Sequence, residues 1–164
     1  MRLEGKALKY GDNVDTDAII AGKHTKNLDP GELARHAMED LDPKFGERVR
    51  PGDFIVAGRE FGCGSSREQA PLALKHAGVS CIVAKSFARI FYRNAINIGL
   101  PVIECDVDGI DDGDILRYDL GNDEVVNVTK QRTMTIRPLP KIMVDILGKG
   151  GLVNYLREFG DWRL

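Results

Sequence analysis

Along the middle of the chain, short apolar runs alternate with segments whose apolar residues recur at helical spacing. The runs at residues 53–58, 79–84 and 101–105 are typical of buried strands. The segments between them, at residues 69–77 and 87–98, have the period of amphipathic helices, and Ser86 is expected to cap the second. This strand–helix–strand–helix–strand order predicts a parallel α/β unit.

The segments before this unit have other patterns. Residues 3–10 predict a first strand. A helix is expected to begin at Asp29-Pro30, because aspartate can cap it and proline suits its first turn. Residues 21–28 are polar and follow neither period, so we expect a mobile loop there.

Beyond residue 110 the chain changes character. Short runs predict antiparallel strands, and two helices are expected to follow them: strands at 115–120, 124–129 and 133–137, then helices from Pro140 to residue 147 and at 152–159. The predicted fold class is therefore α/β, with a parallel α/β core and additional antiparallel strands. We expect one domain over residues 1–164.

The most informative segment is residues 61–68, which read Phe-Gly-Cys-Gly-Ser-Ser-Arg-Glu between a predicted strand and a predicted helix. Ser65 stands at the expected N-cap, and Glu68 three residues later completes the pattern of a capping box. The glycine-rich turn would bring two hydroxyls and a guanidinium to the start of a helix. Such a place favours a carboxylate or another oxyanion.

Several known motifs do not fit this turn. A Rossmann fingerprint and a nucleophile elbow both need glycine at position 67, where Arg67 stands, and a Walker A loop needs a lysine that is absent. An anion-binding turn and a merely structural capped helix remain. Arginine in a first helical turn is unfavourable next to the helix dipole, so Arg67 is better suited to binding an anion.

Composition narrows the function further. The 164 residues carry 23 basic and 25 acidic side chains, a net charge of −2. This balance argues against a nucleic-acid partner, and no window has the apolar length needed to span a membrane. The first residues lack the apolar core of a signal peptide, so we expect a cytoplasmic protein.

The three cysteines, Cys63, Cys81 and Cys105, lie far apart in the sequence. No Cys-x-x-Cys pair is present, which argues against an iron–sulfur cluster held by this chain. Cys81 and Cys105 are expected to be free and buried, whereas Cys63 lies in the glycine turn and is expected to be more accessible.

Three ordered motifs resemble a known family. Residues 62–68, residues 85–90 (Lys-Ser-Phe-Ala-Arg-Ile) and residues 15–19 (Asp-Thr-Asp-Ala-Ile) together look like the small subunits of 3-isopropylmalate dehydratase. Residues 91–99 extend the resemblance, which covers nearly the whole chain. These subunits are similar to the swivelling C-terminal domain of aconitase, so the resemblance implies a single swivelling β/β/α domain.

The resemblance also implies a division of labour between two chains. In this family a large subunit holds a [4Fe-4S] cluster, whose open iron acts as a Lewis acid on a small dicarboxylic or tricarboxylic hydroxy acid. The small subunit supplies the base and further contacts to the substrate's carboxylates. The implied activity is a hydro-lyase that interconverts 2-isopropylmalate and 3-isopropylmalate in leucine synthesis, and this chain alone should be inactive.

Carried over residue by residue, the resemblance implies five roles. Ser65 matches the catalytic serine, which as an alkoxide removes a proton beside a carboxylate. Ser66 matches a substrate hydrogen-bond donor, and Arg67 matches the arginine that binds a carboxylate. Asp17 matches an acid that orients groups of the large subunit. Lys23 lies nearest to the position where the family's specificity loop often carries an arginine.

Alternatives remain open. Lys23 departs from the family pattern, and a cationic loop could favour homoaconitate or another 2-alkylmalate derivative, although lysines in loops are usually only solvated. A non-catalytic anion-binding module is a further possibility. Asp15 and Thr16 are expected to hold their turn, while His36 and His76 are expected to face solvent from helices.

Overall fold

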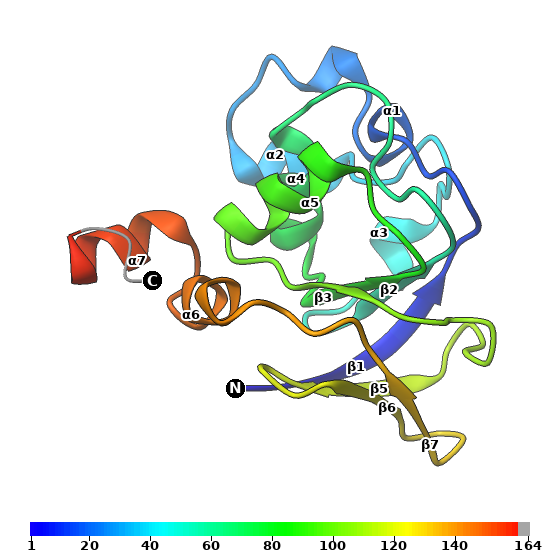
Figure 1. Ribbon diagram of the computed structural model, residues 1–164. Coiled ribbons are helices and arrows are strands. Elements are labelled where there is room, and N and C mark those ends of the chain that lie inside the picture. Colours follow the sequence, from blue (N-terminus) through cyan, green and yellow to red (C-terminus); the bar gives the residue numbers. More distant parts are fainter. Residues whose placement is uncertain (161–164) are drawn as a thin grey trace.

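The computed structural model describes residues 1–160 of the chain, and its centre is a seven-stranded mixed sheet (Figure 1). Strands β1 to β4 pair parallel with one another, and the pairs β1–β5, β5–β6 and β6–β7 are antiparallel. In spatial order the strands are β4 (Val102–Glu104), β3 (Cys81–Ala84), β2 (Phe54–Ala57), β1 (Arg2–Lys9), β5 (Ile115–Asp119), β6 (Glu124–Asn127) and β7 (Arg132–Thr135).

The parallel half confirms the predicted α/β unit. Helix α4 (Gln69–Ala77) connects β2 to β3, and helix α5 (Arg89–Asn97) connects β3 to β4. Every residue of β2 and β3 is buried, as expected of strands that are covered on both faces. Figure 1 shows the helices gathered on one side of these strands, where α2 (Pro30–Arg35) packs against α4.

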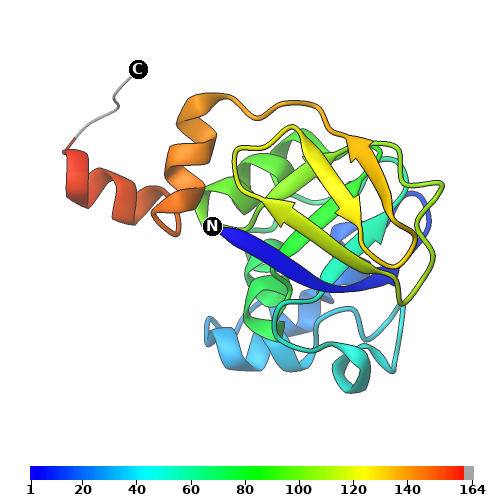
Figure 2. The same ribbon diagram turned by 90° about the horizontal axis from the view of Figure 1, so that it is seen from below.

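Two hydrophobic cores form because successive residues of a strand point to opposite faces. In β2, Ile55 packs among the helices, whereas Phe54 and Val56 pack against the other core. That second core includes Leu116 and Tyr118 of β5. The sheet therefore curls, so that its antiparallel half covers the second face of its parallel half (Figure 2).

The remaining helices have distinct places. Helices α1 (Thr16–Ile19) and α3 (Phe45–Arg48) are short and lie between β1 and β2 in the chain. Helices α6 (Lys141–Gly148) and α7 (Leu152–Phe159) follow the last strand and extend from the body next to α5 (Figure 2). No helix within residues 1–160 is long and apolar enough to cross a membrane.

Ser86 is not the N-cap that the sequence predicts for α5. This helix begins at Arg89, and Ala88 precedes it without a side-chain hydrogen bond. The Ser86 hydroxyl instead accepts a hydrogen bond from the backbone N–H of Glu60, at 2.8 Å. The serine therefore ties the chain after β3 to the segment that follows β2.

Candidate functional site

The glycine turn after β2 is anchored by buried aromatic rings. Phe61 is fully buried, and its ring meets Phe87 and Phe91 edge-on at centroid distances of 6.0 and 5.2 Å. Gly62 has φ +82°, and its backbone N–H donates to the carbonyl of Val14. A Cβ atom at Gly62 would lie 2.2 Å from the Phe91 ring, so only glycine fits there.

This packing gives a stability prediction. Gly62→Ala is expected to lower the free energy of unfolding by about 2–4 kcal/mol, because the left-handed backbone and the collision with Phe91 act together. Gly64→Ala is the matched control: its φ is +93°, but its Cβ would meet nothing closer than 3.6 Å. We expect it to lose about 1 kcal/mol. Urea unfolding of both variants measures the difference, and equal losses would contradict the role given to Phe91.

A second segment holds the turn from the other side. Asp15 caps α1 by accepting from the backbone N–H of Ala18 at 2.7 Å. Thr16 donates its hydroxyl to the carbonyl of Ser65 at 2.9 Å, and its N–H donates to the carbonyl of Cys63 at 2.9 Å. The predicted role of Asp15 and Thr16 in holding their turn is confirmed, and they also fix the backbone on which Ser65 stands.

Ser65 itself is not a helix cap, and the predicted capping box is wrong. Helix α4 begins only at Gln69, and Glu68 precedes it in helical backbone geometry without a side-chain hydrogen bond. The reason lies in the Ser65 carbonyl, which accepts from both the Thr16 hydroxyl and the Arg67 N–H. These bonds add one more bend to the chain before the helix begins.

Arg67 precedes α4 and does not lie in its first turn. Unfavourable interaction with the helix dipole is therefore not a reason to assign Arg67 to an anion. The hydroxyls of Ser65 and Ser66 are exposed, and neither bonds to another group within residues 1–160. Both hydroxyls can therefore form hydrogen bonds with a ligand.

The Arg67 guanidinium lies against the loop after β1. Its Nη1 atom is 2.6 Å from a carboxylate oxygen of Asp17 and donates to the carbonyl of Ile20 at 3.0 Å. The Arg67 side chain is 24% exposed and that of Asp17 is 65% exposed. An ion pair with one partner so exposed contributes about 0–1 kcal/mol. Another carboxylate can therefore replace Asp17 at a small cost in free energy.

The residue before Lys23, Gly22, lies beside this guanidinium. Residues 21–28 are not uniformly irregular, because Gly22–His24 form a short 3-10 helix, η1. A Cβ atom at Gly22 would lie 3.2 Å from Nη2 of Arg67, so η1 passes directly beside the arginine. Lys23 is exposed, and no carboxylate of the described part of the chain pairs with it.

The site lies on an open surface. A groove between α5 and α6 is lined by apolar residues such as Ile96 and Met143, but none of its lining residues belongs to the glycine turn or to η1. The structure thus brings together Arg67, Asp17 and the turn that carries Lys23. Ser65 and Ser66 lie next to Arg67 in the segment between β2 and α4. A second surface would be needed to enclose a substrate there.

The three cysteines are free thiols. Burial raises the pKa of the Cys81 thiol, and it raises that of Cys105 to about 12. Burial and then the charge of Asp15 raise the pKa of Cys63. In the absence of a metal ion, all three therefore favour the protonated thiol over the reactive thiolate.

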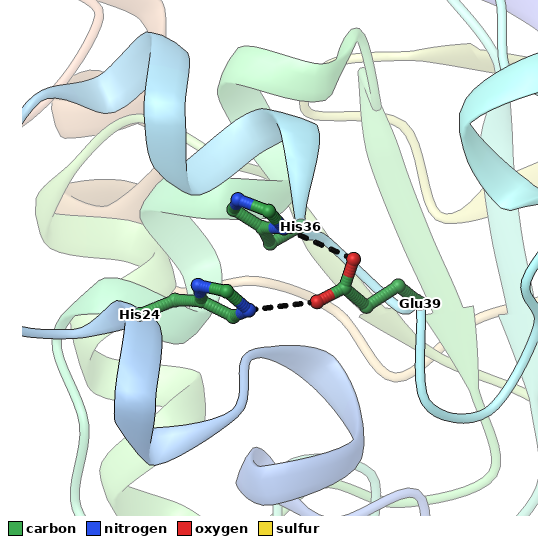
Figure 3. Close-up of side chains that lie close together, drawn as sticks. All are labelled: His24, His36 and Glu39. Carbon is green, nitrogen blue, oxygen red and sulfur yellow. Dashed lines mark hydrogen bonds and ion pairs between the residues drawn. The ribbon is translucent and has the colours of Figure 1, made fainter.

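Sequence reasoning missed a cluster of side chains next to this site. His36 was expected to face solvent, but it is only partly exposed and lies with His24 and Glu39 (Figure 3). The expectation was wrong because α2 ends at Arg35 and the chain then turns back, which brings Glu39 beside the imidazole. His76, by contrast, is exposed on α4 as predicted.

Comparison with known proteins agrees with this architecture. The model of the aconitase C-terminal domain family matches residues 4–107, which include most of β1, all of β2 to β4 and the glycine turn. The chain belongs to this family.

The relatives of this chain show to which group within that family it belongs. The chain is 56% identical to the 3-isopropylmalate dehydratase small subunit of Caldanaerobacter subterraneus subsp. tengcongensis over 95% of this chain and 98% of that protein. It is also 56% identical to the 3-isopropylmalate dehydratase small subunit 2 of Archaeoglobus fulgidus over the full length of both. The crystal structure of a 3-isopropylmalate dehydratase chain from Methanocaldococcus jannaschii matches with a TM-score of 0.93 and 51% identity, covering 98% of this chain and 96% of that one. The chain is thus a member of the 3-isopropylmalate dehydratase small-subunit family, which confirms the resemblance seen in the motifs.

Proposed function

We propose that this chain supplies the base and a carboxylate-binding arginine to a two-subunit hydro-lyase that interconverts 2-isopropylmalate and 3-isopropylmalate. The observation that carries the proposal is the glycine turn. It presents an unbonded, exposed Ser65 hydroxyl two residues from a guanidinium whose present partner, Asp17, is largely exposed. Family membership supplies the reaction class.

The reaction needs a proton removed from one carbon and a hydroxyl lost from its neighbour. Ser65 as an alkoxide takes the proton beside the substrate carboxylate, the C–O bond on the next carbon breaks, and a double bond forms between the two carbons. The departing hydroxide takes up a proton from an acid of the partner subunit and leaves as water. Water then adds in the opposite sense: it gives a proton back to that acid, its oxygen bonds to the carbon that Ser65 deprotonated, and Ser65 delivers a proton to the carbon that lost the hydroxyl. A serine hydroxyl is a weak base at its ordinary pKa, so a nearby positive charge must stabilise its anion. Arg67 is the cation closest in sequence.

Arg67 has the second role. Its fork suits a carboxylate through two parallel hydrogen bonds, and the substrate would take the place that Asp17 now holds. Asp17, once released, is free to orient groups of the partner. Ser66, exposed on the same turn, is suited to donate a hydrogen bond to the substrate.

The partner in this proposal is the family's large subunit, which would enclose the open site. The [4Fe-4S] cluster, assigned here to that subunit, would supply Lewis-acid activation of the substrate hydroxyl. A cytoplasmic location remains a prediction of the sequence.

Reconstitution tests the assignment. We expect no turnover from the isolated chain, because half of the site is missing, and turnover when it is co-expressed with a cluster-bearing large subunit. The ultraviolet absorbance of the unsaturated acid formed by dehydration gives the rate. Turnover by the isolated chain, or none by the assembled pair on any malate derivative, would contradict the proposal.

Lys23 favours a second candidate substrate, homoaconitate or another 2-alkylmalate. A third carboxylate would meet an exposed lysine close to Arg67. Substrate profiles of the reconstituted enzyme, measured with the unmodified chain and with Lys23→Ala, distinguish the two candidate substrates. A loss confined to tricarboxylic substrates would support the second candidate, and unchanged preference for 3-isopropylmalate would support the first.

A stand-alone anion-binding module would behave differently. Titration of the isolated chain with di- and tricarboxylates distinguishes such a module from one half of a two-subunit enzyme. A complete binding site would bind these acids tightly without a partner. Weak binding fits an incomplete site on an open surface.

A further inference from the structure

Two histidines and one glutamate, all from residues 24–39, meet beside the candidate site (Figure 3). His24 belongs to η1, His36 is the C-cap of α2, and Glu39 follows three residues later. His24 Nε2 lies 2.8 Å from one oxygen of the Glu39 carboxylate, and His36 Nδ1 lies 3.0 Å from the other. One ligand atom of each residue lies within 4.8 Å of the others.

The contact between His24 and Glu39 is close but is not aligned as a hydrogen bond. His24 Nε2 is buried and has no partner in hydrogen-bond geometry, although an oxygen lies only 2.8 Å away. Two ligand atoms of one metal ion likewise lie close together without a hydrogen bond between them. Ligands about 2.1 Å from an ion lie about 3.0 Å apart at right angles and about 3.4 Å apart in a tetrahedron.

We propose that His24, His36 and Glu39 form a binding site for one divalent transition-metal ion of the zinc type. The ligands would be His24 Nε2, His36 Nδ1 and one oxygen of Glu39. The three side chains are between 21% and 35% exposed, which leaves room for water as a fourth ligand. Imidazole nitrogens favour zinc and its neighbours over Mg²⁺, which prefers oxygen ligands.

The surroundings suit coordination in one further way. A carboxylate oxygen of Glu32 lies 3.9 Å from His36 Nε2, on the far side of the ring. Carboxylates in this position orient metal-bound histidines.

Coordination requires one movement. The two imidazole rings are stacked, with centroids 3.6 Å apart and planes 4° from parallel. The lone pair of a ring nitrogen lies in the plane of its ring, so parallel rings cannot both aim at one ion. One ring must turn about its bond to Cβ, and in the proposal this is His24.

The consequence concerns η1. An ion bound by these three residues would fasten η1 to the end of α2. Because η1 passes beside Arg67 and carries Lys23, the ion would fix the position of both relative to each other. The inference stands on the cluster alone and does not depend on the proposed reaction.

Metal titration of the purified full chain tests the site. We expect calorimetry to show one Zn²⁺ per chain with a dissociation constant in the micromolar range or tighter, and no binding of Mg²⁺. Each of His24→Gln and Glu39→Gln should weaken Zn²⁺ binding by about 10-fold or more. His76→Gln, on an exposed histidine of α4, should leave it unchanged.

Co²⁺ gives a second readout. Bound at this site, it should show visible ligand-field bands without the near-ultraviolet charge-transfer band of a thiolate, which would reveal binding at a cysteine instead. Circular dichroism establishes that each variant is folded. Absence of Zn²⁺ binding by the unmodified chain, or equal affinity in the His24→Gln and His76→Gln variants, would overturn the proposal.

Discussion

Ser65→Ala is expected to abolish most of the activity of the assembled enzyme while leaving assembly intact. Removing a general base commonly lowers turnover by roughly 10²–10⁴-fold. The hydroxyl bonds to no other group within residues 1–160, and the backbone contacts that hold the turn use the Ser65 carbonyl, which alanine keeps. The loss should therefore appear in kcat, with stability unchanged.

Solvent isotope exchange makes this test specific. In deuterated water the unmodified enzyme should place deuterium on the product carbon that Ser65 protonates, and Ser65→Ala should lose that exchange together with turnover. Ser66→Ala is the matched control, since it removes a neighbouring exposed hydroxyl and should affect KM more than exchange. Wild-type exchange in Ser65→Ala would rule out this residue as the base.

Arg67→Lys is expected to raise KM by roughly 10- to 100-fold, with a smaller effect on kcat. Lysine keeps the charge but not the fork, and hydrogen bonds to charged groups are worth about 1.5–3 kcal/mol. Steady-state kinetics of the reconstituted pair measures the split. An unchanged KM would mean that the guanidinium serves only to bind Asp17 and Ile20.

Asp17→Asn complements this variant. If Asp17 merely occupies Arg67 in the free chain, its removal should lower KM, because the substrate carboxylate no longer competes with it. If Asp17 also orients groups of the partner, kcat should fall. The two kinetic constants therefore separate the two roles that the sequence and the structure suggest.

Much of the fold was predictable because its signals are local. The apolar runs of β2 and β3 are buried on both faces, and such runs leave little choice of structure. The residues of the glycine turn were also recognisable, since their types and spacing are distinctive. Asp29 caps α2 and Pro30 begins it, as predicted.

The errors at Ser65 and Ser86 involve contacts with segments that are distant in sequence, and the error at His36 involves a turn after α2 and a contact with η1. Ser65 and Ser86 have the composition of helix caps, but hydrogen bonds from Thr16 and from Glu60 engage them in other ways. Likewise, the period of the helix from Pro30 gave no indication that His36 would stack on His24. Tertiary hydrogen bonds and ring contacts override local preference at these places, and they lie around the candidate site.

The pairing of Arg67 with Asp17 has a consequence for the unliganded chain in the cell. A bare guanidinium beside two exposed hydroxyls would attract phosphate and the many other small anions of metabolism. Because Asp17 already pairs with Arg67, the positive charge of the guanidinium is neutralised and attracts these ions less. A molecule that also engages the remainder of the completed site would displace that internal occupant more readily than a small anion does, so selectivity begins before the substrate arrives.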